Sequence, residues 1–373
     1  MKLSQVRTGW LAQLKEVYRL DLRSLALLRL GLGVTLLMAI VHRFSLGLTD
    51  EIVAGPRSLL VEDRLWLGQL SELLAGLPWL QGGLLLLTAI AALCLLVGYK
   101  TRKAAIAAWI LVSFWPDSAF LSGTEALLPS ALFWGMFLPL GASYAVDSAL
   151  NPQQMALPRS LFSAATVALM VRQCFVYGFL AQRLAGLRTG PESLTPLANG
   201  LLAADLAQLS PAVFWILLAG PLLLWLPVGT VYLRLLAIVG LGLLPLGLAL
   251  IVPAGLVWLN LVTWLAFLPT AIWQSLTRRC YGPPQAGLTI YFDADCGFCK
   301  KVVHLLRTFL LLPSTPLLMA QSDSSICADM EAQNSWVVVD WQGDRYFKFE
   351  AIAYMSAFLR SLDFWFRCCA GHR

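Results

Sequence analysis

Two cysteines separated by two residues are the side chains of this chain best suited to chemistry. Cys296 and Cys299 enclose Gly297-Phe298, and the apolar run Leu288–Phe292 comes shortly before them. That run predicts a short buried strand, and the pattern from Lys300 through Leu312 predicts a helix. The first cysteine is therefore expected at a helix N-terminus, where unpaired amide groups favour a thiolate.

This placement predicts a redox-active dithiol. A thiolate at Cys296 would attack a disulfide, and Cys299, one helical turn further on, would resolve the mixed disulfide. Two other interpretations stay open. The pair could be half of a zinc site completed by Cys327, His304 or Cys368-Cys369, or both cysteines could be unreactive core residues. Because the chain has no second C-x-x-C, we expect no metal here.

Asp293 follows the predicted strand directly and stands three residues before Cys296. Its carboxylate could accept a proton from the resolving thiol. It could equally cap the turn by accepting hydrogen bonds from nearby backbone amides. Asp293 is therefore a candidate catalytic residue with a structural alternative.

The rest of the C-terminal segment predicts a small α/β domain of the thioredoxin-like class. Pro316–Ala320 is expected to form a second strand. Trp336–Asp340 and Tyr346–Phe349 are expected to pair as a hairpin through Trp341–Asp344, and Ala351–Phe366 is expected to be the closing helix. A strand, the dithiol and a helix thus come in the order that thioredoxin-like redox motifs require.

The spacing Asp293-x-x-Cys296-x-x-Cys299 after a strand resembles the DCC family of predicted thiol–disulfide oxidoreductases, named for that Asp, Cys and Cys. A later Val-Val-Val-Asp stretch, with Gly-Asp-Arg-Tyr after it, is similar to the same family. The resemblance covers roughly 287–365. It implies a protein-disulfide reductase activity carried by the two cysteines.

The remainder of the chain has the composition of a membrane protein. Of the 373 residues, 58% are hydrophobic and 13% are charged, whereas soluble domains carry about 25% charged residues. Leu235–Leu276 contains no Asp, Glu, Lys or Arg, and a bilayer crossing needs about 20 apolar residues. The net charge of +6 does not indicate nucleic-acid binding, because the basic residues stand beside predicted spans.

Eight spans are expected, with both termini on the cytosolic side. In that orientation twelve Lys and Arg residues fall in cytosolic segments and five fall outside, as the positive-inside rule favours. Two termini on one side require an even number of spans. The expected spans are Leu25–Val41, Leu80–Gly98, Ala104–Trp115, Ala126–Val146, Ser160–Ala181, Leu206–Leu226, Leu235–Val252 and Ala254–Leu276.

The composition changes after Arg278-Arg279, where apolar runs become short and charges become frequent. The predicted organisation is a polytopic α-helical membrane domain over 1–279, a linker over 280–287 and the thioredoxin-like domain over 288–373. We expect an integral protein of an inner or plasma membrane, with the dithiol in a reducing cytosol.

Several stretches of the membrane part resemble the HTTM domain, which is related to the vitamin K-dependent γ-glutamyl carboxylase. They include Gly98–Arg102 and Gln173-x-x-Val176-Tyr177, and the resemblance covers roughly 18–275. The carboxylase relatives use an intramembrane lysine as base shortly after the tyrosine. No lysine occurs here from Ala104 to the end of the linker, so carboxylation or quinone epoxidation by that mechanism is not expected.

Arg172 lies deep in the fifth expected span and is the candidate ligand-binding residue of the membrane part. A charge near the bilayer centre costs on the order of 2.5–3.5 kcal/mol, so a partner is required. The expected partner is a carboxylate such as Asp117, Glu125 or Asp147, a backbone carbonyl, a water-filled cavity or a lipid headgroup. The arginine could hold spans together or bind a ligand.

Three functions fit these patterns. The first is a membrane-anchored thiol–disulfide oxidoreductase of the protein-disulfide reductase type. The second is a non-enzymatic lipid- or quinone-binding membrane protein with a redox-regulatory tail, and the third is an HTTM-type membrane enzyme. No cofactor is firmly predicted, and a quinone or a lipid stays open. Membrane lipid is an expected partner, a protein thiol or disulfide could be another, and nucleic acid is excluded.

Overall fold

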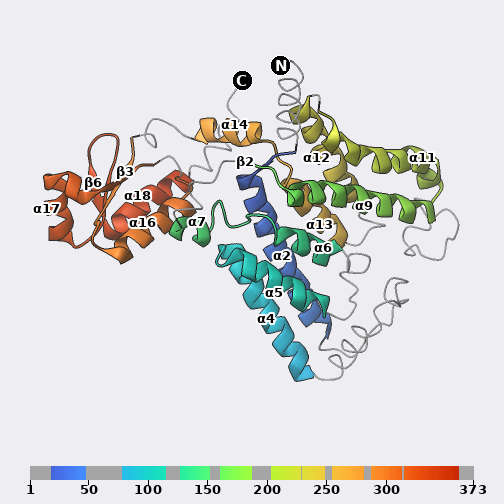
Figure 1. Ribbon diagram of the computed structural model, residues 1–373, viewed down its shortest axis with the longest axis horizontal. Coiled ribbons are helices and arrows are strands. Elements are labelled where there is room, and N and C mark those ends of the chain that lie inside the picture. The colour runs from blue at the N-terminus through green and yellow to red at the C-terminus, as the bar shows by residue number, and fades with distance from the viewer. Residues whose placement is uncertain are drawn as a thin grey trace, which may run out of the picture. The chain divides into compact units, whose positions relative to one another are not determined.

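Helices make up most of the structure, a computed structural model that describes residues 18–47, 78–114, 127–151, 160–186, 203–227, 229–247, 254–280, 287–312 and 315–360 (Figure 1). The chain divides into two units. The first comprises Met1–Ser143 and Pro158–Ala271, and the second comprises Tyr144–Leu157 and Ile272–Arg373.

The first unit consists of apolar helices and one pair of two-residue strands. Leu20 of β1 pairs with Leu161 of β2 in antiparallel register, which joins the start of α2 to the entry of α9. The elements are β1 (Leu20–Asp21), α2 (Leu22–Gly47), α4 (Pro78–Val97), α5 (Thr101–Ser113), α6 (Leu127–Gly135), β2 (Ser160–Leu161), α9 (Ala164–Gly186), α11 (Ala203–Ala219), the 3₁₀ helix η3 (Gly220–Trp225), α12 (Thr230–Gly247) and α13 (Ala254–Leu265).

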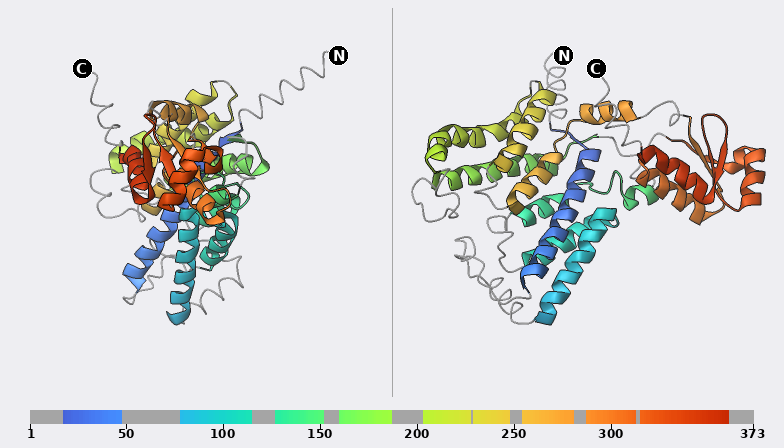
Figure 2. Two further views of the ribbon diagram at one scale, coloured as in Figure 1. Left: turned by 90° about the vertical axis from the view of Figure 1, so that its left-hand side faces the viewer. Right: turned by 180° about the vertical axis from the view of Figure 1, so that it is seen from behind.

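Helix α2 is central to the core of this unit. Leucines at every third or fourth position lie on one face of the helix and are fully buried. α2 packs against α4 and α13, and Figures 1 and 2 show α2, α4 and α5 side by side. Gly31 permits the close approach of α13, because a Cβ at that position would lie 2.5 Å from Cγ1 of Val262.

The outer faces of these helices are apolar too. On α4, Thr88, Ala92 and Leu95 are buried while the opposite stripe of the helix is exposed. A helix of a soluble protein carries polar groups on such a face, so this stripe fits contact with lipid. Its exposed members are Leu86, Leu87, Ile90, Leu93 and Val97.

Three described helices are long and apolar enough to cross a membrane, namely Leu22–His42, Trp79–Val97 and Ala164–Gln182. The pair Val257–Leu265 and Thr270–Arg278 would add a fourth crossing if it is counted as one broken span. These helices indicate that the chain associates with a membrane.

The expected span over 126–146 takes a different form in the described residues. α5 has 13 residues, close to the short span expected over 104–115, whereas α6 has 9 and ends at Gly135. Turns then follow up to Ala145, where the sequence contains Pro139 and Gly141. Proline cannot supply a backbone N–H to a continuing helix and clashes with the preceding turn. The expected continuous helix over 126–146 is therefore wrong.

The second unit contains a four-stranded sheet with the order β4-β3-β5-β6. β3 is parallel to β4 and antiparallel to β5, and β5 and β6 form an antiparallel hairpin. The expected strands and the hairpin at Trp341–Asp344 are confirmed, whereas α17 was not predicted. The elements are α7 (Val146–Leu150), α14 (Thr270–Cys280, apart from its first two residues), β3 (Thr289–Phe292), α16 (Gly297–Phe309), β4 (Leu317–Met319), η4 (Ala320–Ser322), α17 (Ser324–Gln333), β5 (Val337–Val339), β6 (Arg345–Phe347) and α18 (Lys348–Arg360).

Each face of this sheet has its own apolar cluster. Ile290, Phe292 and Val338 pack with residues of α16 and α18. Val337 packs on the other side with Ile326 and with further residues of α17 and η4. Because successive strand residues point to opposite faces, the short strands supply both clusters at once.

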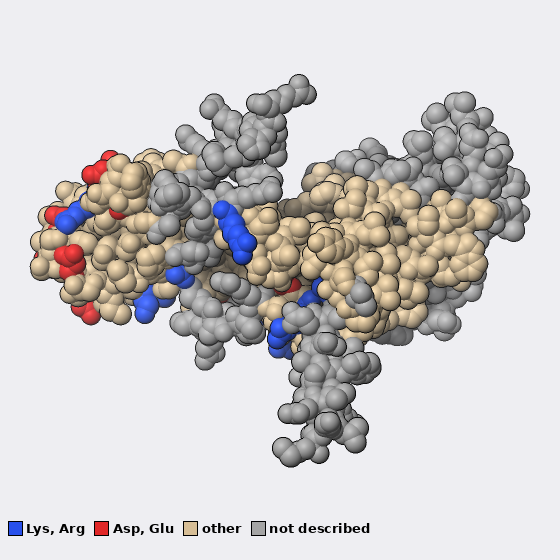
Figure 3. Space-filling view, turned by 90° about the horizontal axis from the view of Figure 1, so that it is seen from above, with Lys and Arg blue, Asp and Glu red and all other residues tan. Residues whose placement is uncertain are grey.

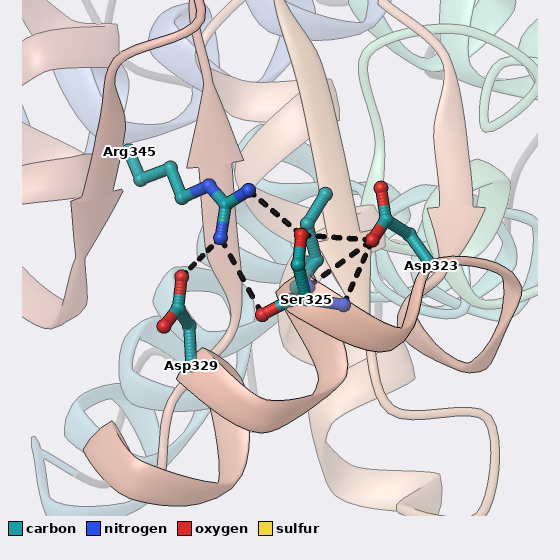
Figure 4. Close-up of polar contacts among 5 residues, drawn as sticks. Asp323, Ser325, Asp329 and Arg345 are labelled. Carbon is teal, nitrogen blue, oxygen red and sulfur yellow. Dashed lines mark hydrogen bonds and ion pairs between the residues drawn. The ribbon is translucent and has the colours of Figure 1, made fainter.

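Helix α17 is fixed to the edge strand β6 by polar contacts (Figure 4). Arg345 donates to the carboxylate of Asp329, to Oγ of Ser325 at 2.8 Å and to the Ser325 carbonyl at 3.4 Å. Asp323 caps the helix by accepting from the N–H groups of Ser325 at 2.9 Å and Ile326 at 3.3 Å. On the face seen in Figure 3, most of the acidic side chains gather over this second unit.

Helix α7 was not expected in this unit. Its segment lies between α6 and α9 in the sequence, yet α7 packs against α16, the helix that follows the first cysteine of the motif. Ser148 and Ala149 of α7 are buried. The second unit is therefore not built from the C-terminal residues alone.

Candidate dithiol site and a buried arginine

The dithiol lies at the junction of β3 and α16. β3 ends at Phe292, and Cys296 is the N-cap residue of α16 with extended backbone angles, φ −87° and ψ 95°. Its Sγ accepts a hydrogen bond from the backbone N–H of Cys299 at 3.2 Å. The first cysteine thus takes the capping position that serine or aspartate usually fills, and its sulfur faces the amides of the first helical turn.

The two thiols differ in acidity. The pKa of Cys296 is lowered because its sulfur accepts hydrogen bonds from the thiol and the backbone N–H of Cys299. The pKa of Cys299 is raised to about 11 because its proton is shared with Cys296 and because the thiol is partly buried. Cys296 is therefore the first to become a thiolate, and Cys299 keeps its proton.

The motif is open to a partner. Both cysteines are half-buried and carry free thiols. The ring of Phe298, between them, is 73% exposed, and a Cβ at Gly297 would have open space around it beyond its own neighbours and helix backbone. These exposures do not fit the interpretation of the cysteines as inert core residues.

Asp293 holds the loop before the motif. Its Oδ1 accepts from the backbone N–H of Asp295 at 3.0 Å and from Nε2 of Gln321 at 2.7 Å. Oε1 of Gln321 in turn accepts from the N–H of Ala294 at 3.3 Å. These bonds match the capping alternative for Asp293. Its negative charge also raises the pKa of both thiols, as a smaller contribution.

Gln321 in η4 and the helix that follows it were not identified from the sequence. The available signal was Asp323 before Ser324, which is a typical helix N-cap pattern. The same helix carries Cys327, whose thiol donates to Oε1 of Glu331 at 3.8 Å. The pKa of Cys327 is raised by burial first and by the charge of Glu331 second.

Among the described residues, no group of three or more His, Cys, Asp and Glu side chains could hold a metal ion. His304 lies against the ring of Phe292, with 6.4 Å between ring centroids. Its pKa is lowered by burial and by nearby cations. Cys368 and Cys369 lie outside the described residues.

Arg172 is buried in α9, with 6% of its surface exposed. Its Nε donates to Oγ of Ser130 at 2.9 Å, its Nη2 to the carbonyl of Leu127 at 2.7 Å and its Nη1 to Oε1 of Gln173 at 3.2 Å. A backbone carbonyl was among the expected partners. Of the expected carboxylates, Asp117 and Glu125 lie outside the described residues. The third, Asp147, belongs to α7 of the second unit.

Tyr177 ties three helices of the first unit together. Its hydroxyl donates to the carbonyl of Leu241 in α12 at 2.5 Å and accepts from Nδ2 of Asn260 at 2.9 Å and Nε1 of Trp264 at 2.7 Å, both in α13. The sequence singled out Tyr177 only through the HTTM resemblance. The one available signal for its partners was a lone Asn within a long apolar run.

The chain matches no protein-family model, no curated protein and no solved structure. The functional assignment below therefore depends on the geometry of the dithiol and on the resemblances carried by the residues quoted above.

Proposed function

We propose that the chain is a membrane-anchored thiol–disulfide oxidoreductase of the protein-disulfide reductase type. Cys296 is the attacking thiol and Cys299 is the resolving thiol. The observation that carries the proposal is the position of Cys296 as N-cap of α16, where its sulfur accepts the Cys299 N–H and has the lower pKa of the pair. Helix N-termini stabilise thiolates in this way.

The reaction follows from this asymmetry. The Cys296 thiolate attacks one sulfur of a partner disulfide, that S–S bond breaks, and the leaving thiolate takes a proton from water. Cys299 then loses its proton and attacks Sγ of Cys296, which releases the second partner thiol. Two electrons pass from the dithiol to the partner. The chain ends as a Cys296–Cys299 disulfide, which a reductant of the dithiol class must reduce before the next turnover.

The order of elements supports a thioredoxin-like fold for the second unit. β3, α16 and β4 form a parallel β-α-β unit, and the β5–β6 hairpin and α18 follow it in the sequence. A C-x-x-C motif beside such a β-α-β unit is typical of thioredoxin-like redox domains. The DCC resemblance covers the same residues and provides a second, separate support.

The membrane arrangement completes the proposal. Three spanning helices, the exposed apolar stripe of α4 and the excess of basic residues in alternate loops support a polytopic domain with both termini in the cytosol. Eight spans is the number that the sequence favours. A cytosolic dithiol would be kept reduced and ready to reduce a partner.

The proposal is tested by reduction of insulin disulfides with the full chain in dodecyl maltoside micelles and dithiothreitol as reductant. We expect turnover above the uncatalysed rate, and a loss of at least tenfold in Cys296→Ser. Cys299→Ser should stop multiple turnovers and accumulate a mixed disulfide on Cys296, which mass spectrometry detects.

Cys327→Ser is the matched control, because its thiol belongs to the same unit and donates to Glu331 within α17. It should keep the wild-type rate. Equal rates in wild type and Cys296→Ser would refute the oxidoreductase. A mixed disulfide trapped on Cys299 instead would reverse the two roles.

A further inference from the structure

The geometry points to an oxyanion site buried in the first unit, at the guanidinium of Arg172. We propose that Arg172, Gln173 and the first turn of α6 bind the carboxylate or phosphate group of an apolar molecule, such as a fatty acid. The inference is independent of the dithiol chemistry, since α6 and α9 belong to the other unit.

The charge of Arg172 is not neutralised by the described side chains of this unit. Asp21 is the one carboxylate among them, because the side chain of Asp205 in α11 lies outside the described side chains, and Asp21 pairs with Arg23 at 2.9 Å. The three partners of Arg172 are a hydroxyl, a carbonyl and a carboxamide, all uncharged. A guanidinium has five N–H donors, so two are left over after these three bonds. A buried charge without a counterion is costly, and an anion would remove that cost.

Gln173 adds donors at the same place. Its side chain is fully buried, and its Nε2 has no hydrogen-bond partner. Oε1 of this carboxamide accepts from Arg172, which fixes the orientation, since a flipped amide would set two donors against each other. Nε2 is bonded to the same carbon as Oε1 and therefore lies close to the guanidinium. Leaving such a buried amide unpaired is unfavourable, and a bound acceptor would offset that cost.

The start of α6 contributes in the same sense. Nη2 of Arg172 contacts the carbonyl of Leu127, the first residue of α6, and Nε contacts Ser130 in the first turn. The guanidinium therefore lies beside the first turn of this helix, and the N-terminal end of a helix carries partial positive charge. Cation, free amide and helix end all favour one ligand chemistry, a negatively charged oxygen.

The position of the site indicates how the ligand arrives. Arg172 stands near the middle of the candidate span Ala164–Gln182, in a unit whose outer helix faces are apolar. A ligand with an acyl chain could enter from the lipid and carry its charged group to the arginine. A free anion such as phosphate offers the same charged oxygens but has no acyl chain to carry it through the lipid. Binding experiments can therefore distinguish a lipid ligand from a soluble anion.

The test measures binding of radiolabelled oleate to the full chain in dodecyl maltoside, together with the melting temperature. We expect saturable binding that weakens at least tenfold in Arg172→Gln, and no binding of methyl oleate, which lacks the charge. Inorganic phosphate is the second probe. Protection of the wild type by phosphate, and not of Arg172→Gln, would support the oxyanion site and assign it to a soluble ion.

Two further variants keep the test decisive if Arg172→Gln does not fold. Gln173→Leu replaces an unpaired buried amide by an apolar group, so it should raise the melting temperature of the unliganded chain and weaken oleate severalfold. Arg102→Gln removes an exposed arginine of α5 and should change neither value. Oleate affinity that is unaltered in both Arg172→Gln and Gln173→Leu would overturn the proposal.

The residues before α6 provide the main competing occupant. Glu125 stands two positions before Leu127 in the sequence and could fill the site from within the chain. In that case the wild type would bind neither oleate nor phosphate, and Glu125→Gln would gain binding of one of them. That result would overturn the proposed ligand.

Discussion

At the scale of single residues, the interaction of Cys296 with Cys299 gives two similar thiols different pKa values. Cys296 accepts from Cys299, so stabilising the thiolate of one residue holds the proton on the other. A nucleophile needs to be ionised before attack, and a resolving thiol needs to stay protonated until the mixed disulfide has formed. The same contact therefore provides both conditions and orders the two steps.

Alkylation of the reduced chain should reveal this order. With iodoacetamide over a pH series, the rate at Cys296 should rise at lower pH than at an ordinary cysteine, because its pKa is lowered. The rate at Cys299 should rise only as the pH approaches about 11. Peptide mass spectrometry reports both rates on one sample. Two thiols that titrate together would contradict the assigned roles.

Asp293→Asn separates the two roles of the carboxylate. Asparagine keeps the oxygen that accepts from Asp295 and removes a charge that raises the pKa of both thiols. We therefore expect the pH profile of insulin reduction to shift to lower pH, with up to a severalfold gain on its acid side. If Asp293 is instead the proton acceptor for Cys299, the same variant will be slower at every pH. Asp295→Asn is the control and should leave the profile in place.

The position of the two cysteines could be predicted from the sequence, because a short motif between a strand and a helix can adopt few geometries. The partners of Asp293 could not. Gln321 reaches it from a segment 28 residues away, and nothing in the local pattern marks a glutamine for that contact. Arg172 was identified because a charge within an apolar run is conspicuous, whereas its bond to Ser130 depends on how α6 and α9 pack.

At the scale of elements, the spacing of apolar residues and the residue types at turns explain which helices and strands could be predicted. The strands of the second unit and their hairpin were found because a β-branched run precedes Gly343 and an aromatic run follows it, and Gly343 has a positive φ of 93°. Helix α17 was missed because its apolar positions, Ile326 and Met330, are too few to set a strong period. α6 was predicted too long because hydropathy does not register the break near Pro139.

Asp340 locks the hairpin onto α18. It accepts from the N–H groups of Gln342 and Asp344, both at 2.9 Å, and from the hydroxyls of Tyr354 at 3.1 Å and Tyr346 at 3.4 Å. Burial alone would raise the pKa of Asp340, but these hydrogen bonds outweigh it, and the pKa is lowered. The ionised form is thus the one that the fold stabilises.

Asp340→Asn should therefore lower the melting temperature of the second unit by several degrees near neutral pH. A carboxyl with a lowered folded pKa stabilises fully above its unfolded pKa of about 3.9. That stabilisation is lost as the pH falls through the folded value. The variant should lack this acid-side loss, as seen by thermal unfolding between neutral pH and pH 3. Asp344→Asn, at an exposed turn position, is the control and should lose stability at acid pH as the wild type does.

At the scale of the whole chain, the second unit is completed by a segment from the middle of the sequence. The sequence indicated a contiguous boundary near Arg279, because composition changes there. Composition cannot show that α7 belongs to the second unit and packs against α16, since α7 is only 5 residues long and has no distinctive period. A pairing of segments so far apart in sequence depends on tertiary packing alone.

This arrangement predicts that α7 supports α16 in the full chain. Ala149 of α7 is 4% exposed and Leu150 is 42% exposed. Ala149→Asp would bury an unpaired carboxylate at a cost on the order of 3 kcal/mol, so α7 should detach. Hydrogen exchange of the α16 amides should then accelerate at least tenfold, and the thiolate at Cys296 should become harder to form as its helix frays. Leu150→Asp introduces the same charge on the exposed side and should leave exchange in α16 unchanged. Equal exchange in both variants and the wild type would mean that α16 needs no support from α7, and that the C-terminal residues form the redox domain by themselves.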